Sequence, residues 1–334
     1  MRETLKIKKW QLVRRKTELA TDDLSGEDFV AVGKRAFRKQ RQLEQVILPP
    51  SVTAIKTEAF CGCQQLKRVI PTGETGLGIG GSAFENCTAL TEIKHFSKIS
   101  RIGARAFAGC ASITDLNFGR SLYWLGEECF YGCSSLTQLR LPFCRDGIGK
   151  AAFADCQKLE HVEMDPALPA LATNLFRGCS ALHRIEFSPL LERIDKGAFR
   201  GCVSLTEITL PASIKRIGSR AFYGCTGRKC TTLELGIVRI GSFAFAKNPA
   251  LCKITLPHSL KHLGFGAFGL GFRREKIRLL VDNEYMLRRL KPRLFLCGSA
   301  GCAELILVGK TIEERKRERR RASVEQSPTH LIDE

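Results

Sequence analysis

Hydrophobic and polar positions follow one pattern along most of this chain, and a Phe marks each return of the pattern. Nine of the ten intervals between these Phe residues are 23 residues long, and the interval from Phe60 to Phe84 is 24. A fixed period of roughly 20 to 50 residues is typical of proteins that stack one small unit many times. Such proteins usually present a long surface instead of enclosing a catalytic pocket. The marker residues are Phe37, Phe60, Phe84, Phe107, Phe130, Phe153, Phe176, Phe199, Phe222, Phe245 and Phe268.

The repeat that starts at Phe130 illustrates the elements that the pattern predicts. Leu139 and Leu141 alternate with polar neighbours, and this period of two is typical of a half-buried strand. Pro142 follows and ends the strand, because proline has no N–H to donate to a ladder. Ile148 then begins a second inward edge before the next Phe. Each coil is therefore expected to direct five or six apolar side chains toward one axis.

The full motif reads approximately I-G-x-x-A-F-x-G-C-x-x-L-x-x-I-x-L-P, as residues 199–225 show. It resembles the BspA-type leucine-rich repeat, a family of 23-residue repeats in bacterial surface proteins and eukaryotic microbes. The resemblance covers about residues 30–280. It implies a leucine-rich-repeat solenoid of eleven coils, with short strands, turns, short helical or 3-10 segments and terminal caps. It also implies an interaction scaffold, because the family binds varied partners.

The ends of the chain differ from the repeats in composition. We expect a basic N-terminal cap segment at 1–29, formed as a strand or a short helix, ahead of the solenoid at 30–280. A C-terminal cap at 281–312 is expected to close the last coil together with the apolar residues from Ile277, with a helix as one form. A basic tail at 313–334 is expected to have no ordered structure. A solenoid needs such caps because its end coils otherwise expose apolar surface.

Eight of the fifteen cysteines lie three residues after a repeat Phe. In leucine-rich repeats, which the motif resembles, this position lies inside the turn and bonds neighbouring backbone, so we interpret these thiols as small buried residues. An odd total leaves one thiol unpaired, and no Cys or His set has zinc-ligand spacing. Cys297 and Cys302 lie outside this series and are the better candidates for reactive thiols. The predicted core comprises Phe60, Phe84, Phe107, Phe130, Phe153, Phe176, Phe199, Phe222, Phe245, Cys63, Cys87, Cys110, Cys133, Cys156, Cys179, Cys202 and Cys225.

Enzymatic chemistry has no support in the sequence. The glycine-rich residues 76–81 lack the Lys-Ser/Thr of a phosphate-binding loop, and we interpret them as a stretched turn between repeats. None of the six histidines has a readable nucleophile or acid partner, and no acidic pair recurs for general acid–base catalysis. We therefore predict a non-catalytic protein without a cofactor or a metal ion.

The variable positions eight and ten residues after each Phe should face outward from the strand. They differ freely in size and charge, which suits a recognition face and suits a merely solvated face equally well. The apolar Ile47 and Ile70 suggest a contact near the N-terminal end. The candidate partner-binding positions are Arg68, Glu92, Lys94, Asp115, Asn117, Gln138, Arg140, His161, Glu163, Arg184, Glu186, Glu207 and Thr209.

The chain is basic, with 53 Lys and Arg against 34 Asp and Glu and a formal net charge of +19. A dense run at 315–321 is either a nuclear-import or anionic-partner patch or a solvated helix end whose acidic neighbours pair with it. No aromatic residue interleaves with the run, so stacking on nucleic-acid bases is not favoured. Ser323 follows two arginines and a spacer, a pattern that suits a basophilic kinase. The basic residues of the run are Arg315, Lys316, Arg317, Arg319, Arg320 and Arg321.

Together these features predict an intracellular scaffold that binds another protein on the outward side of its strands. We expect it in the cytoplasm. No stretch approaches the roughly 20 apolar residues that cross a bilayer, and the N-terminus lacks the apolar core of a secretory signal. The alternative is a nuclear or nucleic-acid-associated adaptor that uses its basic termini. Steep salt dependence would favour the alternative, because phosphate contacts weaken as salt rises.

Overall fold

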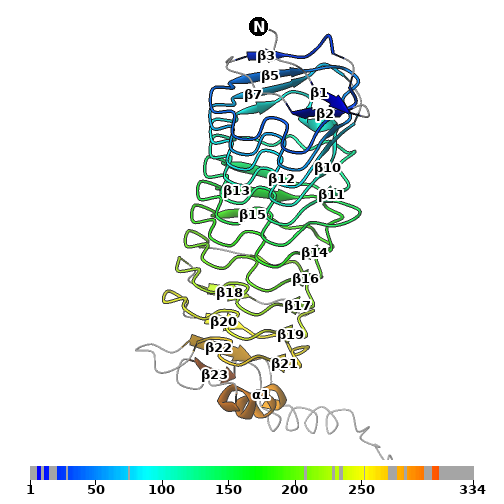
Figure 1. Cartoon of the computed structure of the whole chain (residues 1–334). Coiled ribbons are helices and arrows are strands. Elements are labelled where there is room, and N and C mark those ends of the chain that lie inside the picture. Colours follow the sequence, from blue (N-terminus) through cyan, green and yellow to red (C-terminus); the bar gives the residue numbers. More distant parts are fainter. Residues whose placement is uncertain are drawn as a thin grey trace, which may run out of the picture.

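The computed structural model shows a rod of stacked coils (Figure 1). It describes residues 6–8, 11–14, 21–27, 29–73, 76–206, 209–227, 230–232, 236–251, 253–269, 277–281, 284–296 and 303–307. Strands from the N-terminal segment lie at one end of the rod, and one helix lies at the other end (Figure 1). The prediction of a leucine-rich-repeat solenoid is confirmed.

Short parallel strands, most of them eight to eleven residues after a repeat Phe, form the first ladder along the rod. Its pairing is in register from coil to coil, so Leu139 lies beside Val162 and Val162 beside Ile185. We call its outward surface the strand face. The ladder has three parts: β3 (Thr21–Asp23), β5 (Gln45–Leu48), β7 (Arg68–Pro71) and β9 (Glu92–Ile93); β12 (Gln138–Leu141), β13 (His161–Met164) and β15 (Arg184–Glu186); β18 (Cys230–Thr232), β20 (Lys253–Thr255), β22 (Ile277–Val281) and β23 (Ala303–Leu307).

A second ladder of mostly two-residue strands runs along another side of the rod and directs the predicted Ile or Leu inward. β2 (Gln11–Arg14) joins this ladder in parallel and pairs antiparallel with β1 (Lys6–Lys8). Its members are β4 (Ala31–Val32), β6 (Ala54–Ile55), β8 (Leu77–Ile79), β10 (Ile99–Ile102) and β11 (Trp124–Leu125), then β14 (Ala170–Leu171), β16 (Arg193–Ile194), β17 (Arg216–Ile217), β19 (Arg239–Ile240) and β21 (His262–Leu263).

The turn that carries each Phe connects the second ladder back to the first. Two positions in it, two residues before and two residues after the Phe, have positive φ, as at Arg105 (φ 55) and Gly109 (φ 74) around Phe107. Glycine adopts this conformation without strain, which explains the recurring Gly after the Phe. The turns stack by backbone hydrogen bonds, such as Phe130 N–H to the Ala152 carbonyl at 2.8 Å. We call the surface of the stacked turns the turn face.

The eleven Phe rings stack along the axis of the rod. Neighbouring ring centroids lie 4.9–6.1 Å apart with interplanar angles of 1–23°. All eleven rings are buried. Such offset stacking suits the ring quadrupole, and the column joins the inward Leu, Ile and Val residues in one continuous core.

Three segments differ from the regular pattern. Residues 113–118, where the repeat predicts a strand, form none; there the Asp115 carboxylate accepts a hydrogen bond from the Leu116 N–H at 2.8 Å, and a 3-10 turn, η1 (Phe96–Lys98), precedes the gap. At the N-terminal end the described cap residues form strands and not a helix. At the C-terminal end, residues from Ile277 continue the strand ladder as β22, because Leu279 pairs with Ile254. The expected helix follows as α1 (Glu284–Leu296).

Candidate interaction surface

The strand face is most regular over β12, β13 and β15, where outward side chains form two in-register rows. Gln138, His161 and Arg184 form one row. Arg140 and Glu163 lie opposite each other in the other row, which ends at Glu186. Because the ladder is in register, the type of side chain found 23 residues away decides what each outward residue contacts.

Opposite charges face each other on this part of the surface. Arg140 contacts Glu163 at 3.0 Å, and Glu186 accepts from Arg184 at 2.7 Å and lies 3.2 Å from His161 Nε2. Exposed pairs of this kind contribute about 0–1 kcal/mol each. The rows are therefore polar and close to neutral, and they are not a cationic groove.

The remaining candidate positions of the strand face are scattered around this patch. Arg68 and Glu92 are exposed and in register on β7 and β9. Lys94, Asp115 and Asn117 are exposed beside the interrupted ladder, and Thr209 is exposed. The residues that lie outside the described part of the chain are Glu207, Cys297, Cys302, Arg315, Lys316, Arg317, Arg319, Arg320, Arg321 and Ser323.

The interruption of the ladder leaves two hollows on the strand face. One, of about 230 Å³, lies between residues 90–96 and 113–117. The other, of about 400 Å³, lies between residues 116–120 and the ends of β12 and β13. Phe143 lines the second hollow and is 44% exposed. An exposed aromatic ring beside a polar rim is a feature of protein interfaces, and the repeat pattern alone did not indicate it.

The eight repeat cysteines form a buried series of thiols in the interior. Each Sγ donates to the carbonyl of the Phe in the preceding coil; Cys63 bonds Phe37 O at 2.9 Å, and Cys156 bonds Phe130 O at 3.3 Å. Burial raises the pKa of both thiols to about 12. The cysteines whose side chains the structure describes are free thiols. These thiols are protonated and enclosed, so they satisfy backbone carbonyls and are not nucleophiles.

On the turn face, the N-terminal and central coils carry paired arginines. Arg105 lies between two carboxylates, at 2.7 Å from Glu85 and in contact with Glu128. The hydrogen bond to Glu85 raises the pKa of Arg105 above its ordinary value. Arg177 bonds Asp155 at 2.8 Å, which likewise raises its pKa.

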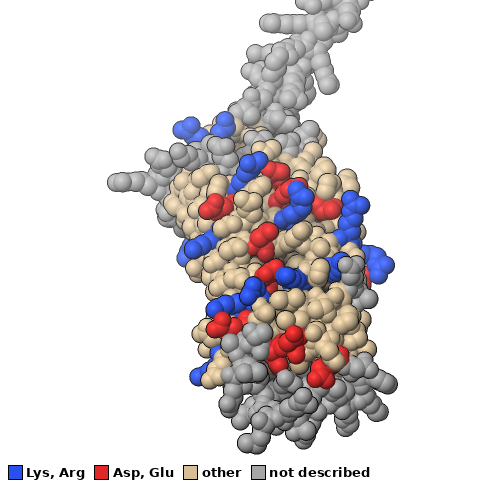
Figure 2. All heavy atoms as spheres, turned by 90° about the horizontal axis from the view of Figure 1, so that it is seen from above, with Lys and Arg blue, Asp and Glu red and all other residues tan. Residues whose placement is uncertain are grey.

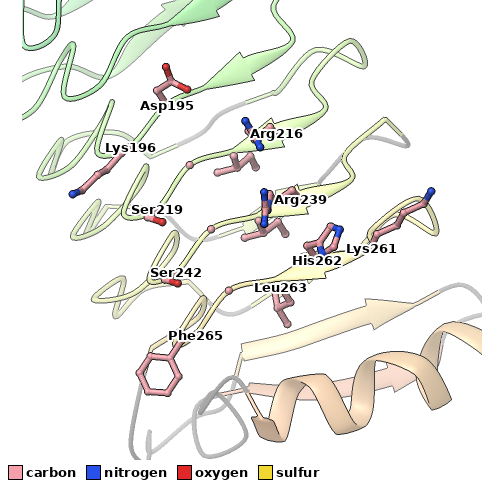
Figure 3. A pocket seen from close by; sticks show the side chains of 15 residues that line it. Asp195, Lys196, Arg216, Ser219, Arg239, Ser242, Lys261, His262, Leu263 and Phe265 are labelled. Atoms are coloured by element: carbon pink, nitrogen blue, oxygen red, sulfur yellow. The ribbon is translucent and has the colours of Figure 1, made fainter.

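The C-terminal coils have a different surface, with two further hollows. One, of about 730 Å³, is lined by Asp195 and Lys196, which follow β16, and by β17, β19 and β21 (Figure 3). The second, of about 590 Å³, lies on the turn face between Arg200 and Gly269. These residues were not predicted as a site, although Arg216 and Arg239 lie one repeat period apart and could have signalled the first hollow.

Charge is mixed on the face that Figure 2 shows, where Lys and Arg side chains alternate with Asp and Glu over a largely uncharged surface. Within the described residues, no group of three or more His, Cys, Asp or Glu side chains is placed to hold a metal ion. None of the helices in that part of the chain has the length and apolar character that a bilayer span requires.

The model of the BspA type leucine rich repeat region matches this sequence in six copies over residues 30–76, 72–183 and 170–281. No curated protein matches the sequence.

Several solved structures resemble this chain. The pneumococcal vaccine antigen PcpA is 17% identical, with 90% of this chain and 92% of that chain covered and a TM-score of 0.50. A leucine-rich cell surface protein of Faecalibacterium prausnitzii is 23% identical, with 70% and 81% covered and a TM-score of 0.43. The T. pallidum leucine-rich repeat protein is 27% identical, with 59% and 83% covered and a TM-score of 0.40.

Proposed function

This chain belongs to the BspA-type leucine-rich repeat family, and from that membership we propose that it is a non-catalytic scaffold that binds a partner protein on its strand face. Repeat proteins of this architecture present extended surfaces for binding. The described residues offer no buried acid–base or nucleophile pair: the buried titratable groups are the thiols and Asp22.

The observation that carries this proposal is the hollow beside Phe143. The exposed Phe143 ring stands next to the in-register pair Arg140–Glu163. A partly exposed aromatic residue in a hollow with a charged rim is a typical anchor for a partner side chain. The rim pairs are nearly neutral, so partner choice would depend on matched polar contacts and not on net charge.

Photo-crosslinking tests where a partner binds. A photoreactive amino acid replaces Gln138 on the strand face in one protein and Arg101 on the second ladder in another; both side chains are exposed. We expect crosslinks to one protein from position 138 and not from position 101. Equal crosslinking from both positions, or crosslinking from 101 alone, contradicts the proposal.

A second experiment measures the contribution of the hollow with the crosslinked partner in purified form. Phe143→Ala is expected to weaken binding at least tenfold by calorimetry, because anchor residues contribute more than about 1.4 kcal/mol each. Leu190→Ala is the matched control, since Leu190 is 59% exposed and lies outside the hollow. An unchanged affinity for Phe143→Ala places the interface elsewhere.

A further inference from the structure

Along the second ladder of the C-terminal coils, basic side chains lie directly opposite each other. The register pairs Arg193 with Arg216, Arg216 with Arg239 and Arg239 with His262. Arg193 is neutralised by Asp195 at 2.9 Å. Arg216 and Arg239 form no ion pair with any other described residue. Like charges on adjacent strands, about 4.8 Å apart, destabilise a sheet, so the fold carries an electrostatic cost here.

Arg216 and Arg239 line the 730 Å³ hollow, and His262 follows them on the next strand (Figure 3). Lys196 and Lys261 also line it, and Asp195 is the single carboxylate among the described lining residues. The floor is bare backbone at Gly218 and Gly241, where a Cβ would stand 2.6 and 2.4 Å from backbone of the preceding coil. A cationic groove with a smooth backbone floor fits a linear anion that runs along the rod.

The second hollow, on the turn face, combines cations with aromatic rings. Arg200 lies over the Tyr223 ring at 5.5 Å, and Lys247 lies over the same ring at 5.6 Å. Arg220 lies over Phe243 at 5.6 Å. No Asp or Glu is among the described residues that line this hollow.

An unpartnered polar atom belongs to the same hollow. Asn248 lines it and is 3% exposed. Its amide nitrogen donates to the carbonyls of Phe222 and Phe245, both at 2.9 Å, so the network determines the orientation of the amide. Its Oδ1 is buried and has no hydrogen-bond partner among the described residues. A buried acceptor without a donor is costly, and a ligand that carries an N–H group would supply the donor.

The two hollows lie on either side of one ridge. Ser219 and Ser242 line the first hollow, and the residues that follow them, Arg220 and Phe243, line the second. Phe265 stands at one end of the first hollow (Figure 3), is 52% exposed, and contacts the Phe243 ring edge-on at 5.7 Å. A ligand that crosses the ridge would therefore meet cations and rings in turn.

We propose that this corner of the C-terminal coils binds single-stranded nucleic acid, with phosphates along Arg216 and Arg239 and a base over the ridge at Phe265. Proteins that bind single strands combine a cationic groove for the backbone with side chains on which bases stack. Guanidinium groups also stack on bases, and Arg200 and Arg220 line the second hollow. An acidic peptide would use the cations but would leave the rings without a role. This surface is separate from the strand face.

Fluorescence anisotropy on the full chain tests the proposal with a labelled 12-nucleotide single strand. Arg216→Gln with Arg239→Gln is expected to weaken binding at least tenfold. It should also reduce the slope of log K against log salt by about 1.4, because each lost phosphate contact removes about 0.7. The matched control is Arg140→Gln with Arg184→Gln, which makes the same change in charge on the strand face. Equal weakening by the two double variants overturns the proposal, because it shows a net-charge effect.

Two further probes separate base contacts from phosphate contacts. An abasic strand of the same length should bind about fivefold or more weakly than the intact strand, and Phe265→Ala should abolish that difference, because stacking on a side chain is sequence-tolerant and strong. Equal affinity for intact and abasic strands overturns base binding. Tighter binding of a 12-residue polyglutamate than of the single strand assigns the site to an acidic protein and overturns the proposal.

Discussion

Two stretches of the turn face share one interior and differ in how they neutralise charge. In the coils of Phe84, Phe107 and Phe130, the rings stack at 5.1–5.2 Å, and Arg105 lies between Glu85 and Glu128. In the coils of Phe199, Phe222 and Phe245, the rings stack at 5.4 Å, and Arg220, at the same repeat position as Arg105, lies over a ring.

The difference shows how a solenoid separates stability from surface chemistry. The interior repeats because each coil must bury the same apolar positions against its neighbours. Outside, the side chain one coil away decides whether a cation meets a carboxylate, a ring or another cation. Arg105 of the central coils contacts two carboxylates, whereas Arg216 and Arg239 of the C-terminal coils form no ion pair with a described residue.

The largest expected effect tests whether the two interiors are equivalent. Phe222→Ala should lower the free energy of unfolding by about 3–5 kcal/mol, the usual range for a large buried aromatic residue. Phe130→Ala should lie at the upper end, because Phe130 also contacts the Phe96 and Phe118 rings. Urea denaturation measures both variants. A smaller loss of unfolding free energy for Phe130→Ala than for Phe222→Ala would show that the additional ring contacts of Phe130 do not stabilise the central coils.

Alkaline pH should destabilise both regions through the buried thiols. Burial raises the pKa of Cys63 and Cys156 to about 12 from an ordinary value of 9.0, so in this range the unfolded chain loses protons that the folded chain keeps. The contribution of these thiols to the free energy of unfolding is therefore fully present below about pH 9 and is lost as the pH rises toward 12.

The slope of this loss is about 1.4 kcal/mol per pH unit for each thiol. Chemical denaturation at several pH values measures the slope. Cys156→Ala is the comparison variant, and its slope should be smaller by about 1.4 kcal/mol per pH unit, the contribution of one thiol. A free energy of unfolding that does not change from pH 8 to 11 would show that the fold does not raise the pKa of these thiols.

The paired arginine of the central coils should stabilise the fold slightly. Arg105→Gln removes both carboxylate contacts and should cost about 0.5–1 kcal/mol at low salt, with a smaller loss in high salt because ions screen exposed pairs. Thermal denaturation at two salt concentrations measures this. A cost that does not change with salt would mean that Arg105 acts through packing.

In the second ladder of the C-terminal coils, removal of an arginine is expected to raise the free energy of unfolding instead of lowering it. Arg216→Gln removes repulsion between in-register guanidinium groups and should raise stability at low salt by a few tenths of a kcal/mol, up to about 1 kcal/mol. The same denaturation series measures it beside Arg105→Gln. A lower free energy of unfolding for Arg216→Gln would show that contacts of Arg216 within the fold outweigh the repulsion between the guanidinium groups.

The smallest effect concerns a single carboxylate. The Arg35 guanidinium bonds Glu58 at 2.9 Å and lowers the pKa of that carboxyl group below its ordinary value of 4.5. The contribution of the pair is present above the unfolded pKa and is lost as the pH falls through the folded pKa. NMR titration should show Glu58 titrating below other glutamates, and Arg35→Gln should return it toward 4.5.

Much of the architecture could be predicted from particular residues. The repeat of Phe, Cys and Ile positions indicates the coil, the ladders and the continuous core, because burial selects the same residue types in every turn. The break at residues 113–118 was not predicted, since Leu116 keeps the apolar pattern while the Asp115 side chain bonds the backbone. The hollow at Phe143 follows from that break and was missed with it.

The sequence by itself determined which side chains face the axis, because every coil must bury the same set of apolar positions. Only the tertiary structure decided which surface charges meet. Arg105 pairs with Glu85 across 20 residues and with Glu128 across 23, and Asn248 bonds carbonyls 26 and 3 residues away. The period places Glu128 one coil from Arg105, whereas the contacts of Arg105 with Glu85 and of Asn248 with two carbonyls depend on side-chain reach that the period does not specify.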